Sequence, residues 1–116
     1  MQRDNLYLSD IIEASDAIAR FLGGVKESGF AGNDLLRSAV LQKLVVIGEA
    51  AKRVGRGVQE RHPEVPWSDI VAFRNIAVHA YFSVNWSTVW ITANEEVPAL
   101  KTQITNILNQ LESGDD

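Results

Sequence analysis

Apolar residues recur at intervals of three and four along almost the whole chain, and this spacing most constrains the fold. It predicts a first helix that ends before Gly23-Gly24, where glycine tolerates a positive φ. A second helix is predicted to begin at Asn33 or Asp34, either of which can cap it, and to end at Gly55. No stretch of useful length alternates between apolar and polar residues, so the chain is not expected to contain strands.

The second half of the chain continues the helical pattern after a loop. The loop covers residues 57–67, and Ser68 is predicted to cap a third helix that runs to Tyr81. Asn85 is predicted to cap a fourth helix, which Pro98 should kink or split in two. Four or five helices joined by short loops predict an all-α, antiparallel helical bundle.

Length and composition restrict the class of protein further. The 116 residues predict a single domain over 1–116, with residues 112–116 as a frayed, charged tail. The chain lacks Cys, which excludes disulfides and thiolate metal sites. Its net charge of −4 argues against nonspecific binding of nucleic acid by a basic coat, although a small local phosphate site remains compatible with it. Without a signal-peptide pattern or a membrane-length apolar run, the expected location is the cytoplasm.

The middle of the second helix, LVVIGEAA, is apolar on nearly every side. Val45 and Val46 fall outside the arc that holds the other apolar residues of this helix. Such a helix is either central in a crowded core or covered by a partner, which makes a homodimer a reasonable prediction. Glu49 lies in the same stretch. It either faces solvent or is buried beside a cationic or hydrogen-bonding partner.

The two histidines differ in their surroundings. His62 lies in the polar loop and is expected to be solvated, whereas His79 follows apolar residues of the third helix. With so few histidines and no Cys, neither a zinc site nor any other metal or cofactor is expected.

The segment FRNIAVHAY carries the most suggestive group of polar residues. In a helix, Asn75 and His79 share one face, while Arg74 and Tyr81 share another at the edge of the apolar stripe. An arginine in that position needs an anion, either a carboxylate such as Glu49 or a bound phosphate.

Two interpretations of this segment stay open on the residues alone. One is a structural Arg–Glu pair with a hydrogen-bonded histidine. The other is cleavage of RNA without a metal, in which histidine transfers protons and arginine stabilises the phosphorane. Since His79 cannot be acid and base at once, the second interpretation needs two copies of the segment around one two-fold axis.

These residues also carry a resemblance to a known family. The order Arg74, four residues, His79, one residue, Tyr81 resembles the motif of HepT-like toxins of the HEPN superfamily. The resemblance extends through YLSDIIEA, AVLQKLVVIGEAAKRV, VPWSDIVAFRNIAVHAYFSVNWSTVW and VPALKTQI, which together span nearly the whole chain. One departure is Asn85, where aspartate is expected, but both residues cap helices.

The resemblance implies a homodimeric, metal-independent endoribonuclease, the toxin of a type VII-like toxin–antitoxin pair. In such a protein Arg74 and His79 would be catalytic, and Asn75 would orient them. Glu49 is counted as a supporting residue for a separate reason, its possible pairing with Arg74. The implied partner is a nucleotidyltransferase antitoxin that transfers AMP onto Tyr81. The added bulk and negative charge would block RNA from the site.

A cluster of basic residues lies around the end of the second helix. Lys52, Arg53 and Arg56 could guide an RNA backbone, or they could simply complement the helix macrodipole ahead of Gly55. Two other functions remain as alternatives to the nuclease. The chain could be a non-catalytic, nucleotide-binding or adaptor partner of a nucleotidyltransferase, or a structural helical adaptor in which Arg74 serves to pair with Glu49.

Overall fold

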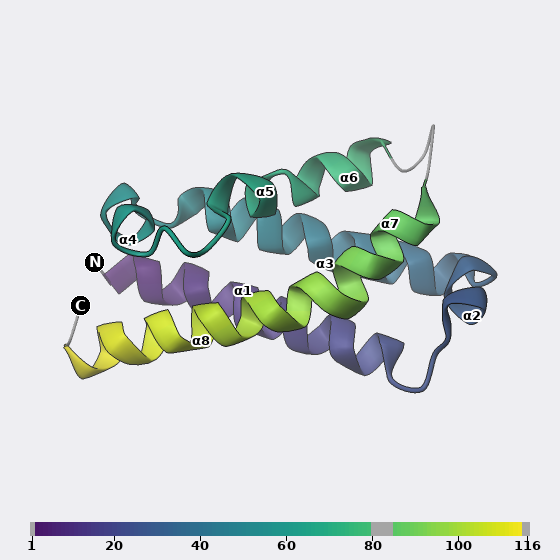
Figure 1. The fold of residues 1–116 in the computed structure, drawn as a ribbon, viewed down its shortest axis with the longest axis horizontal. Helices are drawn as coiled ribbons and strands as arrows, with labels where there is room; N and C mark the ends of the chain where they lie inside the picture. The colour runs from purple at the N-terminus through teal and green to yellow at the C-terminus, as the bar shows by residue number, and fades with distance from the viewer. Residues whose placement is uncertain (1, 80–84, 115–116) are drawn as a thin grey trace.

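The computed structural model confirms that the fold is an all-α bundle (Figure 1). It describes residues 2–79 and 85–114, except for the side chains of residues 2 and 77–79. The helices are α1 (Gln2–Leu22), α2 (Glu27–Ala31), α3 (Asp34–Arg53), α4 (Arg56–Arg61), α5 (Trp67–Val71), α6 (Phe73–His79), α7 (Trp86–Ile91) and α8 (Val97–Ser113), with a π-helical turn η1 (Thr92–Glu96) before α8.

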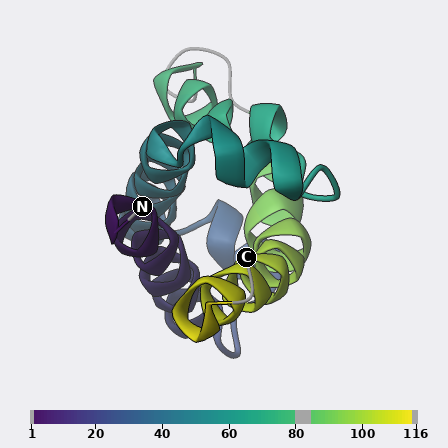
Figure 2. The same cartoon turned by 90° about the vertical axis from the view of Figure 1, so that its left-hand side faces the viewer.

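The long helices α1, α3 and α8 form the body of the bundle. Helix α1 runs antiparallel to both α3 and α8, and α5 and α6 lie along α3 (Figure 1). The view along the bundle shows the helices arranged in a ring around a common axis (Figure 2), and both chain ends lie at the same end of the bundle as α4 (Figure 1). The chain therefore places α6 on one side of α3 and α1 on another.

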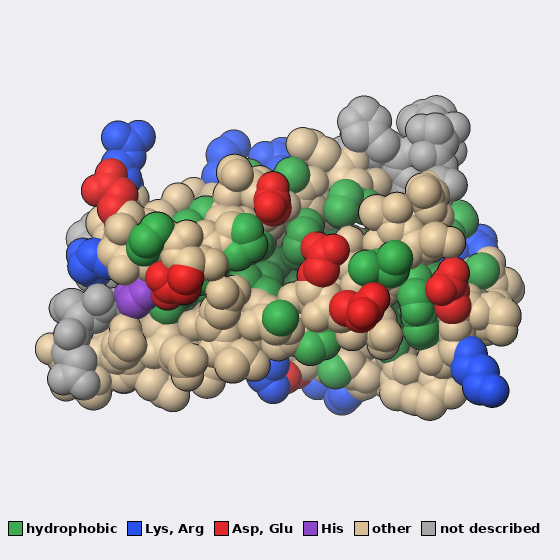
Figure 3. All heavy atoms as spheres, viewed as in Figure 1, with side chains coloured by type: hydrophobic (Ala, Val, Ile, Leu, Met, Phe, Trp, Pro, Cys, Tyr) green, Lys and Arg blue, Asp and Glu red, His purple; other side chains and the backbone are tan. Residues whose placement is uncertain are grey.

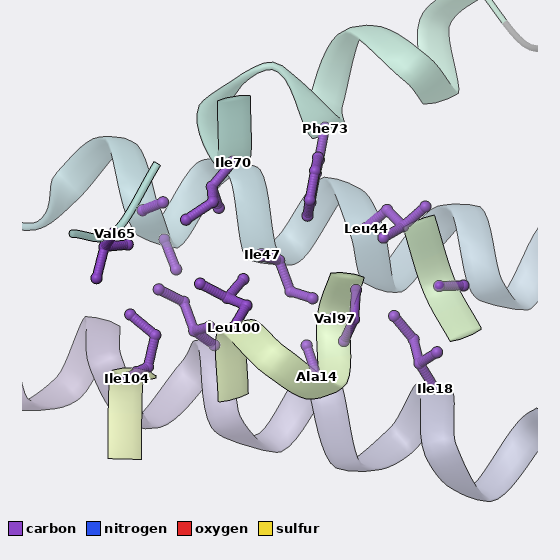
Figure 4. Close-up of a cluster of buried hydrophobic side chains, with 14 of the residues drawn as sticks. Ala14, Ile18, Leu44, Ile47, Val65, Ile70, Phe73, Val97, Leu100 and Ile104 are labelled. Carbon is purple, nitrogen blue, oxygen red and sulfur yellow. The ribbon is translucent and has the colours of Figure 1, made fainter. Parts of the chain in front are cut away.

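The core is built from the apolar stripes that the sequence predicts. Figure 4 shows Ile70 and Phe73 pointing from α5 and α6 toward Leu100 and Val97 of α8, with Ile47 of α3 between them. All of these side chains are buried. This shared core fixes the α5–α6 segment between α3 and α8.

Several predicted helix ends are confirmed. The side chain of Asn33 accepts a hydrogen bond from the Leu36 amide at 3.0 Å, and that of Asn85 accepts one from the Thr88 amide at 3.2 Å. Gly24 has the predicted positive φ, 75°, just past α1. Local cap chemistry therefore determined these ends.

The helix around Pro98 is split, as predicted. Helix α7 and helix α8 are joined through η1, and Pro98 lies within the first turn of α8. Proline has no amide hydrogen and clashes with the carbonyl four residues before it, so a widened turn accommodates it without ending the helix.

Other predicted ends are wrong. Helix α3 ends at Arg53, two residues before the predicted end at Gly55, and the expected loop contains the additional helix α4. Ser68 does not cap the third helix, because α5 begins at Trp67 after Pro66. The third helix is also not continuous: it is interrupted at Ala72, between α5 and α6.

Helix α2 was not predicted, because its five residues are too short to show a period. Its Phe30 is fully buried and packs edge-on against Trp86 of α7, with ring centroids 6.1 Å apart. The Arg37 guanidinium lies 4.7 Å from the centre of the Trp86 ring, a cation–π contact. Tertiary packing therefore explains why this short helix forms.

Helix α8 includes Glu112 and Ser113, the first residues of the tail that is expected to fray, and has Gly114 as its C-cap, with a φ of 79°. Within the described ranges, no helix combines the length and apolar character needed to cross a membrane.

Candidate functional site

The structure pairs Arg74 with Glu49. The Arg74 Nε lies 3.0 Å from Glu49 Oε1, and the two side chains are 40% and 38% exposed. The printed contact of this ion pair is made through Nε, and 40% of the Arg74 side chain is still exposed to solvent. A guanidinium exposed in this way can also form hydrogen bonds that a phosphate accepts.

Gly48 explains how α3 comes close enough for this pair. A Cβ at Gly48 would lie 3.0 Å from the Arg74 amide nitrogen, and 3.1 and 3.2 Å from the carbonyl oxygens of Val71 and Ile70. A side chain at this position would therefore push the α5–α6 junction away from α3. Glycine allows the two backbones to touch, which brings Glu49 opposite Arg74.

Sequence reasoning missed this role of Gly48, although a signal was present. A glycine inside a helix costs about 1 kcal/mol relative to alanine, so its presence in the middle of α3 calls for a packing reason.

The other motif residues are only partly described. Asn75 is exposed on α6, one residue after Arg74. The backbone of His79 belongs to the end of α6, while its side chain lies outside the described part. Tyr81 lies outside the described residues altogether. His79 lies five positions after Arg74 in the helix, which corresponds to a rise of about 7.5 Å along the axis.

A groove runs beside Glu49 between α1 and α3. It has a volume of about 370 Å³ and is lined mainly by apolar groups, with Arg53 at its end. Val45 and Val46, the residues outside the apolar arc, are half-buried and line this groove together with Tyr7. The apolar face of α3 thus remains partly open to solvent beside the Arg74–Glu49 pair.

The basic residues at the end of α3 are all exposed. Lys52 and Arg53 occupy its last turn, where they complement the helix macrodipole. Arg56 is the first residue of α4, where a positive charge gains nothing from the macrodipole of that helix. The macrodipole therefore accounts for Lys52 and Arg53 but not for Arg56.

The expectation that His62 is solvated is wrong. His62 is 8% exposed, and its Nδ1 lies 3.3 Å from Glu64 Oε2. Its carbonyl accepts a hydrogen bond from the Trp67 indole at 3.0 Å. The residue fixes the chain between α4 and α5, a tertiary role that its polar sequence neighbours concealed.

The end of α3 is also held by a residue that sequence analysis did not single out. Asp4 is buried, and its carboxylate accepts a hydrogen bond from the Gly55 amide at 2.8 Å. This contact ties the start of α1 to the α3–α4 turn. In the described part of the chain, no three acidic or histidine side chains gather closely enough to hold a metal ion.

Comparisons with known proteins identify the family. A family model described as "Ribonuclease HepT-like" matches residues 11–107. The chain is 34% identical over 110 residues to "Putative RNase MJ1216" of Methanocaldococcus jannaschii, covering 95% of this chain and 91% of that protein. It is 36% identical over 95 residues to "Probable ribonuclease HepT" of Thermococcus cleftensis, covering 82% of this chain and 86% of that one. No solved structure gave a significant match. Since the family model spans most of the sequence, the chain belongs to the HepT-like ribonuclease family.

Proposed function

We propose that the chain is a metal-independent endoribonuclease, the toxin of a type VII-like toxin–antitoxin pair. The observation that carries this proposal is the half-exposed side chain of Arg74, which Glu49 contacts at Nε and which stays accessible to a phosphate. Glu49 orients the arginine without burying it. Family membership supplies the independent support for RNA as the substrate.

The proposed reaction is an internal attack within RNA. A base removes the proton of the 2′-hydroxyl, the 2′-oxygen attacks phosphorus, and an acid protonates the departing 5′-oxygen. Histidine suits both proton transfers because its ordinary pKa lies near neutrality, so we assign them to His79. Arg74 stabilises the charge that develops on the phosphate, and Asn75 orients these groups.

A dimer completes this site in our proposal. Each chain brings one His79, so base and acid come from two copies related by a two-fold axis. The groove with half-buried Val45 and Val46 beside Glu49 supports α3 as part of the interface, because burying it would bring two Arg74–Glu49 pairs close together. Exposed Lys52, Arg53 and Arg56 would then guide the RNA backbone toward the cleft.

The proposed regulation acts on Tyr81. A nucleotidyltransferase antitoxin would transfer AMP from ATP onto its hydroxyl and release pyrophosphate. An added phosphate and nucleoside two residues beyond His79 would repel and obstruct RNA. Intact mass after incubation with the antitoxin and ATP should rise by one adenylyl group in the wild type and stay unchanged in Tyr81→Phe. A modification that persists in Tyr81→Phe would remove this residue from the proposal.

The test of the nuclease is RNA cleavage in EDTA by the wild type, Arg74→Ala and His79→Ala. Loss of general acid–base catalysis predicts a rate reduction of about 10²–10⁴-fold for His79→Ala. Equal cleavage by all three proteins would refute the proposal. Sedimentation tests the dimer: the wild type should sediment as a dimer at micromolar concentration, and Val45→Lys should shift it toward monomer.

One observation favours a second candidate, the structural adaptor: Arg74 already has a carboxylate partner. In that function Arg74→Ala would mainly lower the melting temperature. A half-exposed ion pair contributes no more than about 1 kcal/mol, however, so this pair is a weak reason to place an arginine here. Growth arrest on expression separates the nuclease from any non-catalytic partner, which should be harmless with or without the motif.

A further inference from the structure

A second hollow lies between α5 and the helix formed by η1 and α8. It has a volume of about 270 Å³. Pro66, Asp69, Ile70 and Phe73 line one side, and Glu96, Ala99, Leu100 and Gln103 line the other. Each set has the spacing i, i+3, i+4 and i+7, so each forms one stripe along its segment. The hollow is therefore a groove between two facing stripes that do not close over each other.

The floor and the rim of this hollow differ in character. Ile70, Phe73 and Leu100 are buried and form an apolar floor. Asp69 and Glu96 are exposed at the rim, one on each side. Figure 3 shows apolar side chains in a hollow near the middle of this face, acidic side chains around it, and basic side chains toward the outline.

The charge of the rim selects the occupant. Among the described lining residues none is Lys or Arg, and the chain as a whole has a net charge of −4. Carboxylates on both sides attract a cationic group and repel the phosphates of RNA. This hollow is thus electrostatically opposite to the surface that presents Arg74.

The size of the hollow further restricts the kind of ligand that it can hold. Its volume of about 270 Å³ is below the range of about 300–1,000 Å³ that is typical of sites for drug-sized ligands. One large apolar side chain from a partner, flanked by basic residues, matches both the floor and the rim. An anchor of this kind is the usual core of a peptide-docking site.

We propose that this hollow docks a basic, amphipathic segment of a partner protein. One apolar side chain of the segment packs on the floor formed by Ile70, Phe73 and Leu100, and flanking Lys or Arg side chains pair with Asp69 and Glu96. This docking site is independent of RNA cleavage and does not rest on the nuclease proposal.

The test uses a short fluorescein-labelled peptide with lysines around a central phenylalanine, titrated with the full chain while anisotropy is measured. Asp69→Asn/Glu96→Gln should weaken binding by about threefold to thirtyfold, the effect of losing two exposed charge pairs. Glu60→Gln/Glu112→Gln makes the same change in net charge at exposed positions outside the hollow, so it should weaken binding by less than about twofold.

One further protein variant and one further peptide distinguish docking in the hollow from nonspecific electrostatic attraction. Ala99→Phe adds apolar volume at the rim without a change in charge, and it should abolish peptide binding. A peptide with serine in place of phenylalanine should bind at least about tenfold more weakly, because the burial of one aromatic side chain is lost. Circular dichroism of each variant confirms that it is folded.

Several results would overturn the proposal. They are the absence of measurable peptide binding by the wild type, equal weakening by the two charge-changing pairs, and unchanged binding by Ala99→Phe. Displacement of the peptide by RNA would assign the hollow to nucleic acid. Wild-type self-association that Asp69→Asn/Glu96→Gln removes would assign it to a second copy of the chain.

Discussion

The Arg74–Glu49 pair and the acidic hollow lie on two sides of the same short segment. Phe73 faces the hollow, whereas the next residue, Arg74, meets Glu49 of α3. One side presents a half-exposed guanidinium paired with Glu49, and the other presents carboxylates around an apolar floor. The net charge of −4 for the whole chain does not report how the charged side chains are distributed between these two sides. Local geometry, not overall charge, determines which partner each surface can accept.

The first prediction tests what the floor of the hollow contributes to stability. Leu100 is 4% exposed, so Leu100→Ala should reduce the free energy of unfolding by about 2–5 kcal/mol, through lost burial and a cavity. Leu35 is 82% exposed, so Leu35→Ala should change the free energy of unfolding by less than about 0.5 kcal/mol. Urea unfolding measures both values. Equal effects would show that the floor is not part of the core.

The second prediction concerns Gly48, where α3 touches the backbone of the α5–α6 junction. Gly48→Ala should destabilise the protein by about 1–3 kcal/mol, because its Cβ would press on the backbone at Val71 and Arg74. Gly29 is exposed in α2, where a Cβ meets only ordinary contacts, so Gly29→Ala should be neutral or stabilise by up to about 1 kcal/mol.

The same two variants also test whether the position of Gly48 affects RNA cleavage. If Gly48 sets the position of Arg74, Gly48→Ala should also reduce RNA cleavage by the folded fraction, while Gly29→Ala should leave cleavage unchanged. A stabilised Gly48→Ala protein with normal cleavage would contradict the close approach of α3 and α6.

The third prediction has the smallest expected effect on stability. Asp69→Asn/Glu96→Gln should shift the free energy of unfolding by less than about 1 kcal/mol, because both carboxylates are exposed. RNA cleavage in the absence of a partner should stay within about twofold of the wild type, since exposed charges away from the site are largely screened. A strong loss of cleavage would show that the hollow belongs to the catalytic surface.

Local sequence signals predicted the fold class and several helix ends. The side chains of Asn33 and Asn85 cap their helices as expected, and Pro98 splits the last helix. These features depend on residues within one turn of each other, so the sequence alone contains the required information.

Features that depend on distant contacts were not predictable in the same way. Helix α2 depends on packing of Phe30 against Trp86, and the burial of His62 depends on the fold around α4. The interruption at Ala72 coincides with the approach of Gly48, more than twenty residues earlier in the chain. At the candidate site, the spacing predicted that Arg74 needs an anion but could not choose between Glu49 and a phosphate. The structure shows that Glu49 contacts Nε of Arg74 while the Arg74 side chain stays 40% exposed.

The most direct test of the account is a paired measurement on one purified variant, Arg74→Ala. Cleavage of RNA in EDTA and the free energy of unfolding are measured on the same preparation, with Arg20→Ala, an exposed arginine on α1, as the matched control. If Arg74 stabilises the phosphate, the variant should lose about 10²–10³-fold in cleavage and no more than about 1 kcal/mol in stability. Unchanged cleavage together with a clear loss of stability would contradict the account and assign Arg74 to the structural pair with Glu49.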